Sequence, residues 1–494
     1  VGGAEELAHG RPWLFKMPLM HSAERQIARG GRARLESFEP RGARYLELAV
    51  ARNRTPVTIH GIGMVSHVYP YQRRGWFECS DPFFTTLWEY GWNTLRLCSE
   101  DVITDTPWRE RTLYGGDLLP EMATALVATG DLRLPRRCVE IFLQSFNPGL
   151  ATLQSAAPKR LDTPGLIDYP LIIMLITEWL CRLTGDRALA GRAQPIFDAM
   201  LARVRQTRRS DGLYGTDARA FIDHHYTQRR GCLCAVNALI AAAFAAYASL
   251  RELQGDAAAA KQYTALAAGL RAAINTAFWN ARAGAFADVL PGTAEDRRTH
   301  STTANAWALL FGAPAPAQAA RVLRLFSRQM RRFDPRDEGQ LMSAYGAFYG
   351  LGALYMHGAE ALAEEAMRTV YAMMIAQPTG TIWEHAHPEK SLSHAWSTAP
   401  NYYLSTRTLG VRLGFPERAP LDDIVIAPQA ASLQWARGRV PHPLGTVDVD
   451  WRIEGELLRL TYRAPAGAHV TVAPQGRLAA LHTVVTRADY MDGI

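Results

Sequence analysis

The sequence of 494 residues is poor in cysteine, which argues against a disulfide-rich protein and against a zinc-finger protein. Six cysteines are few for this length, and none of them forms a CxxC pair or a zinc-finger spacing. We therefore expect no disulfide framework. The one close pair, Cys232 and Cys234, begins an apolar segment, where buried thiols are a more common explanation than a metal site.

Lysine is also scarce, because it occurs only at Lys16, Lys159, Lys261 and Lys390. The formal net charge of +7 could indicate an acidic partner such as nucleic acid. The arginines that carry this charge are instead dispersed among aspartates and glutamates, with no stripe of interleaved aromatics. We expect no nucleic-acid partner.

Long apolar runs are missing as well. No stretch of about 18 or more uncharged apolar residues occurs, and the most apolar run, Leu171 to Leu180, is interrupted by Glu178. The chain opens Val-Gly-Gly without a charged and then apolar leader. We expect no membrane partner and slightly favour a cytoplasmic location, while compartment and oligomeric state stay open.

Hydrophobic periodicity divides the chain into three units. Residues 1–75 contain strand-like runs at 45–50 and 57–67 and predict an N-terminal β unit, the remnant of a β-sandwich. Residues 76–415 show apolar residues at three- and four-residue spacing, which indicates helices. Residues 416–494 return to alternation and predict a C-terminal β-sandwich, with strands at 424–427, 433–440, 446–453, 457–462 and 470–473.

Twelve helices are predicted in the middle unit, over 82–98, 117–129, 134–145, 168–184, 187–206, 232–253, 256–278, 301–311, 317–329, 338–352, 359–375 and 393–409. The connections alternate between short turns, many containing glycine, and long loops at 99–116, 146–167, 207–231, 279–300 and 376–392. In a ring of six antiparallel pairs the long loops share one end. We predict a multidomain, mainly α protein with an (α/α)6 barrel, whose closure brings the loop near residue 110 beside the loop near residue 384.

The first long loop concentrates side chains that are costly to bury. Three carboxylates, an arginine and two aromatics are the candidates for binding or catalysis: Asp105, Trp108, Arg109, Glu110, Tyr114 and Asp117. Taken singly, each has a structural explanation; Asp117, for example, could merely cap the following helix. So many such groups together favour a functional loop.

The last long loop carries the second group of candidates, Trp383, Glu384, His394 and Trp396. His385 and His387 invite a metal interpretation, but no third ligand stands at a fixed spacing, so we expect no metal and no cofactor. Aromatic rings and hydrogen-bonding side chains are typical of a pocket for a small polar ligand such as a sugar.

Two carboxyl groups on opposite sides of a bond are what glycoside hydrolysis requires, one protonated and one ionised. Glu110 and Glu384 meet this requirement if the barrel closes. Burial and neighbouring anions such as Asp105 or Asp117 would raise the pKa of an acid, and a polar setting would keep a base charged.

At these two loops the chain resembles the bacterial α-L-rhamnosidases of glycoside hydrolase family 78. The residues in register with the first family motif are Asp105, Pro107, Arg109, Glu110, Gly116 and Asp117, and those in register with the second are Trp383, Glu384, Ser391, Leu392 and His394. Weaker similarities include Phe221-Ile222-Asp223 and a C-terminal pattern from Ile426 to Trp451. The resemblance covers about residue 40 to the end.

The resemblance implies an inverting glycosidase acting on terminal α-L-rhamnose, with Glu110 as general acid and Glu384 as general base. It also implies sugar ligands, which we expect to be Asp105, Trp108, Arg109, Tyr114, Asp117, Asp168, Asp223, Trp383, His394 and Trp396. The chain differs from the family at Thr106, where cysteine is usual, at Tyr114 and Gly115, and at Leu166 to Tyr169, where many members carry Trp-Gly-Asp. These differences affect the sugar pocket and leave the acid and base in place.

Two alternatives from other classes stay open. One is another (α/α)6-barrel glycosidase that acts on uronides, which would need pocket arginines facing a sugar carboxylate. The other is a non-catalytic sugar-binding relative, which would bind rhamnose without turnover. Activity on uronides but not rhamnosides would reveal the first, and binding without activity the second.

Overall fold

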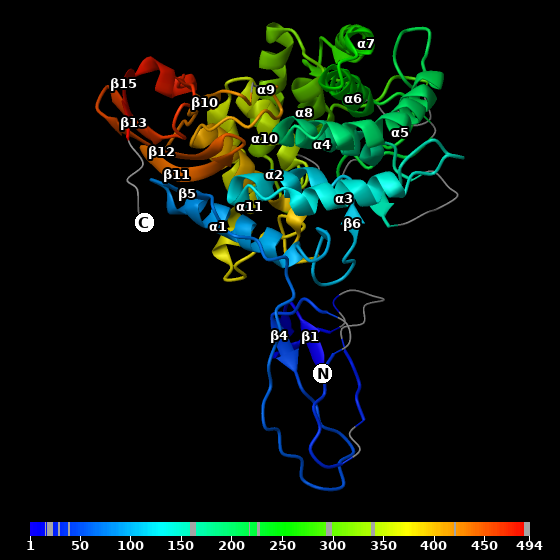
Figure 1. The fold of residues 1–494 in the computed structure, drawn as a ribbon, viewed down its shortest axis with the longest axis vertical. Coiled ribbons are helices and arrows are strands. Elements are labelled where there is room, and N and C mark those ends of the chain that lie inside the picture. Colours follow the sequence, from blue (N-terminus) through cyan, green and yellow to red (C-terminus); the bar gives the residue numbers. More distant parts are fainter. Residues whose placement is uncertain are drawn as a thin grey trace.

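The computed structural model describes residues 1–14, 16, 23–27, 30–37, 40–158, 165–216, 218–224, 228–292, 299–336, 341–418 and 421–488. Its centre is helical (Figure 1). Twelve α-helices lie in the described part of the chain: α1 (Pro82–Cys98), α2 (Leu118–Thr129), α3 (Arg133–Gln144), α4 (Asp168–Thr184), α5 (Arg187–Gln206), α6 (Cys234–Leu253), α7 (Ala257–Ala277), α8 (Thr302–Phe311), α9 (Pro316–Met330), α10 (Ala347–Met356), α11 (Glu360–Ala376) and α12 (Ala399–Tyr403).

The even-numbered helices form a closed inner ring. Each inner helix contacts the next one, in the order α2, α4, α6, α8, α10 and α12, and α12 contacts α2. These helices are apolar on nearly all sides and almost wholly buried, whereas α3, α5, α7 and α9 bury only one face. The predicted barrel of helical hairpins is confirmed.

Short-range chemistry sets where the helices begin and end. Asp186 and Asp256 accept from backbone amides of the first turns of α5 and α7, and Ser301 does the same for α8. Gly130 and Gly185, both with positive φ, end α2 and α4 in the left-handed conformation that glycine adopts at little cost. These stops make the short turns between hairpins.

One inner helix, α6, is long and apolar enough to cross a membrane by length and composition alone. Most of it is buried inside the protein, where it contacts α4, α7 and α8. Its apolar character is therefore explained by its place in the inner ring.

Two predicted helices were wrong in extent. The segment predicted over 338–352 begins as a helix only at Ala347, and residues 338–340 lie outside the described residues. The connection between α9 and α10 is therefore long as well, like the other odd-to-even connections. The segment predicted over 393–409 divides into a 3-10 turn (Ala395–Ser397), α12 and a π-helical turn (Leu404–Thr408), because Pro400 cannot donate a backbone hydrogen bond within a longer helix.

The C-terminal strands build two sheets. The strands are β10 (Ile424–Ile426), β11 (Trp435–His442), β12 (Gly445–Glu454), β13 (Leu457–Arg463), β14 (Val470–Val472) and β15 (His482–Arg487). One sheet has the order β15-β13-β12-β11-β5, and the other pairs β10 with β14 in parallel. The edge strand β5 (Trp76–Cys79) precedes α1, so this sheet contains strands from before and after the barrel in the sequence. The predicted C-terminal β fold is confirmed, and β15 was not predicted.

The N-terminal segment holds short strands, β1 (Gly2–Ala4), β2 (Leu7–Ala8), β3 (Arg11–Pro12) and β4 (Tyr45–Glu47), with β1 paired to β4 and β2 to β3. It extends away from the barrel on the side of α1 and β6 (Leu113–Tyr114) (Figure 1). The strand predicted over 57–67 was wrong, because this stretch finds no partner strand and exposes Ile62 and Val65. Three further short strands lie between the helices, β7 (Ala156–Ala157), β8 (Trp279–Asn280) and β9 (Ala285–Phe286).

Candidate active site

The first and last long loops lie against each other, as closure of the ring predicts. The backbone amide of Ala395 donates to the carbonyl of Asp105 at 2.9 Å. The hydroxyls of Thr106 and Ser391 lie within hydrogen-bond distance at 3.2 Å. Residues separated by more than 280 positions therefore share one site.

Arg109 contacts both candidate catalytic carboxylates. Its Nη1 lies 3.3 Å from Oε1 of Glu110, and its Nη2 donates to Oε2 of Glu384. Its Nε donates to the Ser391 hydroxyl at 3.2 Å, which fixes the plane of the guanidinium. The Glu110 side chain is 41% exposed and that of Glu384 only 3%, so the two carboxyl groups face different environments.

The Glu384 carboxylate is held in its ionised form. Burial alone would raise its pKa, but the adjacent His385 imidazole and the positive charge of Arg109 outweigh burial, and the pKa lies well below the ordinary glutamate value. The backbone amide of Ser391 also donates to Oε2 at 3.2 Å. A carboxylate that is ionised at neutral pH has lone pairs with which to accept a proton.

Asp105 and Asp117 are buried beside this pair. Burial raises the pKa of Asp105 well above its usual value, and the neighbouring Glu110 carboxyl group raises it further. Burial raises the pKa of Asp117 in the same way, with the charge of Glu110 adding to it. Within the described part of the chain, Oδ2 of each has no hydrogen-bond partner. Both carboxyl groups can thus donate to or accept from a polar ligand.

Asp117 is more than a helix cap. It precedes α2, but its side chain makes no capping hydrogen bond, and Oδ1 accepts from the Tyr169 hydroxyl at 3.5 Å. Gly116 is required beside it, because a Cβ there would lie 2.4 Å from the Tyr169 ring. The Asp117 carboxylate therefore contacts Tyr169 rather than the end of the helix.

His394 and Trp396 form one wall of the site. Their ring centroids lie 4.2 Å apart, and Trp396 also packs against Tyr345 and Phe221. Burial lowers the pKa of His394 to about 3, so the imidazole is neutral near pH 7. Its Nε2 lies 3.8 Å from Oδ2 of Asp105, and a neutral imidazole can donate or accept there.

Two aromatics of the first loop border the same region. Trp108 is buried under the Lys16 ammonium, which lies 5.8 Å from its ring centroid. Tyr114 is half-buried, and burial raises its pKa, with the charges of Glu110 and Asp105 adding to it. Their sugar-binding roles stay predictions.

Three other predicted ligands use their polar atoms elsewhere. The Asp168 carboxylate accepts from the amides of Phe221 and Ile222, and that of Asp223 accepts from Ser343 and Thr303. Trp383 is 1% exposed and donates its indole N–H to the Thr379 hydroxyl. Contact of these three side chains with a sugar stays a prediction, and here they order the loops around the site.

The N-terminal segment contacts both loops where it meets the barrel, which the sequence did not indicate. Glu5 accepts from the Leu392 amide at 2.8 Å, and burial raises its pKa to about 8. Gly42 donates to the carbonyl of Pro107 at 2.8 Å, and Arg44 donates to that of Pro378 at 2.7 Å. The segment thereby fastens the loop of Glu110 to the loop of Glu384.

Comparison with protein families agrees with this geometry. Residues 72–407 match the bacterial α-L-rhamnosidase six-hairpin glycosidase domain, about two thirds of the chain. The chain belongs to that family. Residues 410–483 match the C-terminal domain of bacterial α-L-rhamnosidases. No curated protein sequence matches.

Solved structures of several rhamnosidases resemble the chain. A family 78 rhamnosidase of Bacillus sp. GL1 is 25% identical with a TM-score of 0.75, over 86% of this chain and 45% of that one. An α-L-rhamnosidase from Dictyoglomus thermophilum is 18% identical with a TM-score of 0.67, over 83% and 46%. One from Streptomyces avermitilis, solved with L-rhamnose, is 19% identical with a TM-score of 0.62, over 78% and 37%. The chain spans less than half the length of each.

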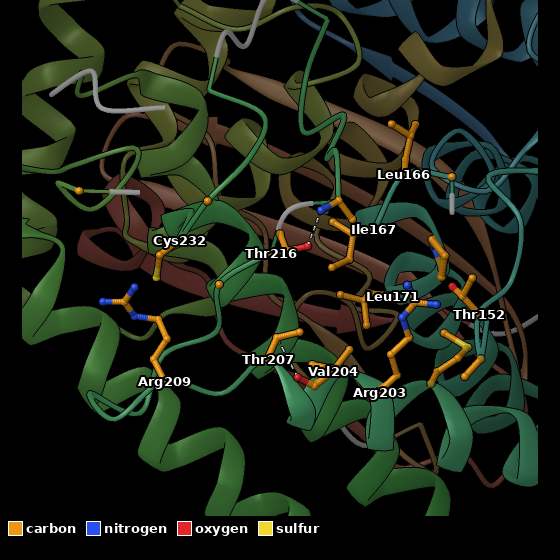
Figure 2. Close-up of a pocket in the computed structure, with 18 residues that line it drawn as sticks. Thr152, Leu166, Ile167, Leu171, Arg203, Val204, Thr207, Arg209, Thr216 and Cys232 are labelled. Carbon is orange, nitrogen blue, oxygen red and sulfur yellow. Dashed lines mark hydrogen bonds between the residues drawn. The ribbon is translucent and has the colours of Figure 1, made fainter. Parts of the chain in front are cut away.

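A cavity of about 700 Å³ in this six-hairpin glycosidase domain is lined by residues other than the candidate catalytic ones. Figure 2 shows its lining, which includes Leu166 and Thr216 from two of the long loops and Arg203 from the end of α5. None of the carboxylates described above is among the lining residues. Cavity size therefore does not mark the catalytic centre here.

Glu121 is a further buried acid that sequence reasoning missed. It follows Asp117 by one turn of α2 and is wholly buried, and neither carboxyl oxygen has a hydrogen-bond partner among the residues that the structure describes. Burial raises its pKa well above the ordinary value, and the charges of Asp117 and Asp105 add to the shift. Burial and these charges therefore favour the protonated form of Glu121 in the folded protein.

We expect Glu121→Met to increase the free energy of unfolding by about 1–3 kcal/mol at pH 8, because it removes an unsatisfied buried carboxyl group. The pKa of Glu121 is higher in the folded protein than in the unfolded chain. The free energy of unfolding of the wild type therefore falls as pH rises above the ordinary glutamate pKa. The gain should therefore shrink toward pH 4. Urea unfolding at both pH values measures it.

A matched control for this prediction is Glu364, which is equally buried but accepts from two backbone amides and the Ser432 hydroxyl. Glu364→Met should destabilise the protein, because it leaves these donors unsatisfied. Equal effects of the two substitutions would contradict the interpretation of Glu121.

Proposed function

We propose that this chain is an inverting glycoside hydrolase that removes terminal α-L-rhamnose from glycosides or oligosaccharides. Membership of the bacterial α-L-rhamnosidase six-hairpin family supports the reaction class. The observation that carries the proposal is the pair of unlike carboxyl groups on one guanidinium, Glu110 at the exposed side and Glu384 buried and ionised. The proposed units are 1–75, 76–415 and 416–494.

In this mechanism Glu110 is the general acid. Its partly exposed carboxyl group lies where a leaving group can depart to solvent, and it donates a proton to the glycosidic oxygen as the bond from C1 breaks. Glu384 is the general base, which takes a proton from the water that attacks C1 from the opposite face. The buried carboxyls of Asp105 and Asp117 bind hydroxyl groups of the sugar.

Inversion needs space for a water between the sugar and the base. Arg109 contacts Glu110 with one terminal nitrogen and Glu384 with the other, so the two carboxylates do not touch. The width of a guanidinium and the two contacts allow their nearest oxygens to lie up to about 8 Å apart, a limit that is compatible with the roughly 6.5–9.5 Å between the carboxyl groups of inverting enzymes.

The engagement of Arg109 also argues against the uronide-directed alternative. A uronide pocket needs an arginine whose donors are available to a sugar carboxylate. Arg109 already contacts two carboxylates and the Ser391 hydroxyl. A substrate carboxylate would add a further negative charge beside Glu384.

The test is turnover of a panel of p-nitrophenyl glycosides by the purified chain, with the α-L-rhamnoside and a β-D-glucuronide among them. We expect release of p-nitrophenol from the rhamnoside and the β-anomer of rhamnose as the first product in proton NMR spectra. The α-anomer appearing first would contradict inversion. Turnover of the glucuronide alone would favour the uronide alternative, and rhamnose binding without turnover would favour a sugar-binding protein.

A further inference from the structure

Two histidines lie against the buried Glu384 carboxylate. His385 follows it in the chain, with Nε2 3.7 Å from Oε1 of Glu384. His224 comes from the loop between α5 and α6, and its ring lies edge-on to that of His385 with centroids 4.3 Å apart. One ligand atom from each of the three residues lies within 4.8 Å of the other two. The two histidines take part in none of the steps assigned above, whereas Glu384 is the proposed general base.

The two oxygens of Glu384 face different partners. Oε2 accepts from Arg109 and from the Ser391 amide, whereas Oε1 is the oxygen nearest His385. A cation bound at Oε1 would therefore leave the Arg109 ion pair in place. Oε1 is also the oxygen best placed to accept a proton from water in the proposed mechanism.

The loop that presents His224 is held firmly. Ile222 adopts a φ of +60°, which is costly for a β-branched residue. The Asp168 carboxylate stabilises this turn by accepting from the Ile222 amide at 2.7 Å, and the His224 amide donates to Asp223 at 2.7 Å. A backbone constrained in this way keeps the imidazole near Glu384.

Two imidazole nitrogens and one carboxylate oxygen are a donor set that binds Zn²⁺ while leaving a fourth position open. In a tetrahedral site with bonds of about 2.0–2.2 Å, ligand atoms lie roughly 3.3–3.5 Å apart. Oε1 of Glu384 and Nε2 of His385 are already close to this spacing. The ligand atom of His224 lies within 4.8 Å of the other two, so a side-chain shift of at most about 1.5 Å would bring it to this spacing.

We propose that His224, His385 and Glu384 bind a divalent transition-metal ion of the Zn²⁺ class, and that the bound ion blocks hydrolysis. Binding follows from the three side chains alone. The block rests on the proposed function, because the ion takes the Oε1 position that would otherwise accept a proton from the attacking water.

The first test measures binding without activity. Titration calorimetry of the full chain with ZnCl₂ should give one site with micromolar or tighter affinity, and CoCl₂ should give the visible absorption of a four- or five-coordinate ion. His224→Ala should weaken binding at least tenfold. His387→Ala is the matched control, because His387 is a neighbouring histidine outside the group, paired with Glu389 at 3.7 Å, and this variant should bind as the wild type does.

The second test measures p-nitrophenyl α-L-rhamnoside turnover. Zn²⁺ should inhibit the wild type reversibly, with recovery on adding EDTA, and should inhibit His224→Ala at least tenfold less effectively. Absence of the calorimetric site, or a site that His224→Ala leaves unchanged, would overturn the metal proposal. Zn²⁺ binding without inhibition of an active enzyme would overturn the block, and an inactive wild type that still binds Zn²⁺ would count against the proposed function alone.

Discussion

Replacing Glu384 by glutamine is expected to lower kcat for p-nitrophenyl α-L-rhamnoside by about 10²–10⁴-fold, the usual contribution of a general base. Glutamine keeps the shape of the side chain and can still accept from Arg109 and the Ser391 amide, but it cannot take a proton from water. The loss should therefore fall on kcat rather than on rhamnose affinity, which calorimetry measures separately.

Glu178 provides the matched control for Glu384. It is also buried and paired with an arginine, since Oε1 lies 2.7 Å from Nε of Arg182, but it stands in the last turns of α4. Glu178→Gln should cost stability and leave kcat unchanged. If both variants lose activity alike, the effect of Glu384→Gln is one of folding and not of catalysis.

Small anions sharpen the assignment of Glu384. In Glu384→Gly, azide can attack C1 without losing a proton, so the C1–N bond forms as the C1–O bond breaks, and β-L-rhamnosyl azide should accumulate. Formation of the α-azide would contradict attack from the face opposite the leaving group. No rescue at all, with folding intact, would argue against Glu384 as the base.

The pH dependence of kcat/KM reports on the same carboxylate. Because the pKa of Glu384 lies below its ordinary value, the base stays ionised and activity persists as pH falls toward the ordinary glutamate pKa. Arg109→Met removes the neighbouring positive charge, so the pKa should rise and the acidic limb should move to higher pH.

The fold followed from the sequence because the barrel repeats one simple pattern. Inner helices are apolar on nearly all sides and outer helices on one side. Glycines such as Gly130 and Gly185 end helices at the short turns. The alternation of loop lengths was then enough to bring Glu110 and Glu384 to one face. The structure of the N-terminal stretch could not be predicted in the same way. Alternation at 57–67 indicates a strand, but it does not show whether a partner strand is available.

Within the site, the sequence located residues but not their partners. His385 was noticed as a metal ligand and set aside because a third donor was missing at a fixed spacing. That donor, His224, stands 161 positions earlier and meets His385 only through the ring of helices. Glu121 was hidden in an apolar helix, and Glu5 in a segment whose docking depends on tertiary contacts alone.

Replacing Glu110 by glutamine is expected to have an effect that depends on the leaving group. p-Nitrophenol leaves as a stable anion and needs little protonation, so kcat/KM for its rhamnoside should fall only about tenfold. A sugar alcohol is a far poorer leaving group, and hydrolysis of a rhamnosyl-glucose disaccharide should fall about 10³–10⁴-fold. The measurement is kcat/KM for both substrates in both proteins.

Glu89→Gln is the matched control for Glu110. Glu89 lies on α1, is 43% exposed and forms an ion pair with Arg73. It therefore resembles Glu110 in exposure and in having an arginine partner, but it lies among other neighbours. Equal losses of Glu110→Gln on both substrates would contradict an acid role and indicate that Glu110 serves mainly to hold Arg109. A selective loss on the disaccharide would instead identify the proton donor, because only protonation of the departing oxygen depends on the basicity of the leaving group.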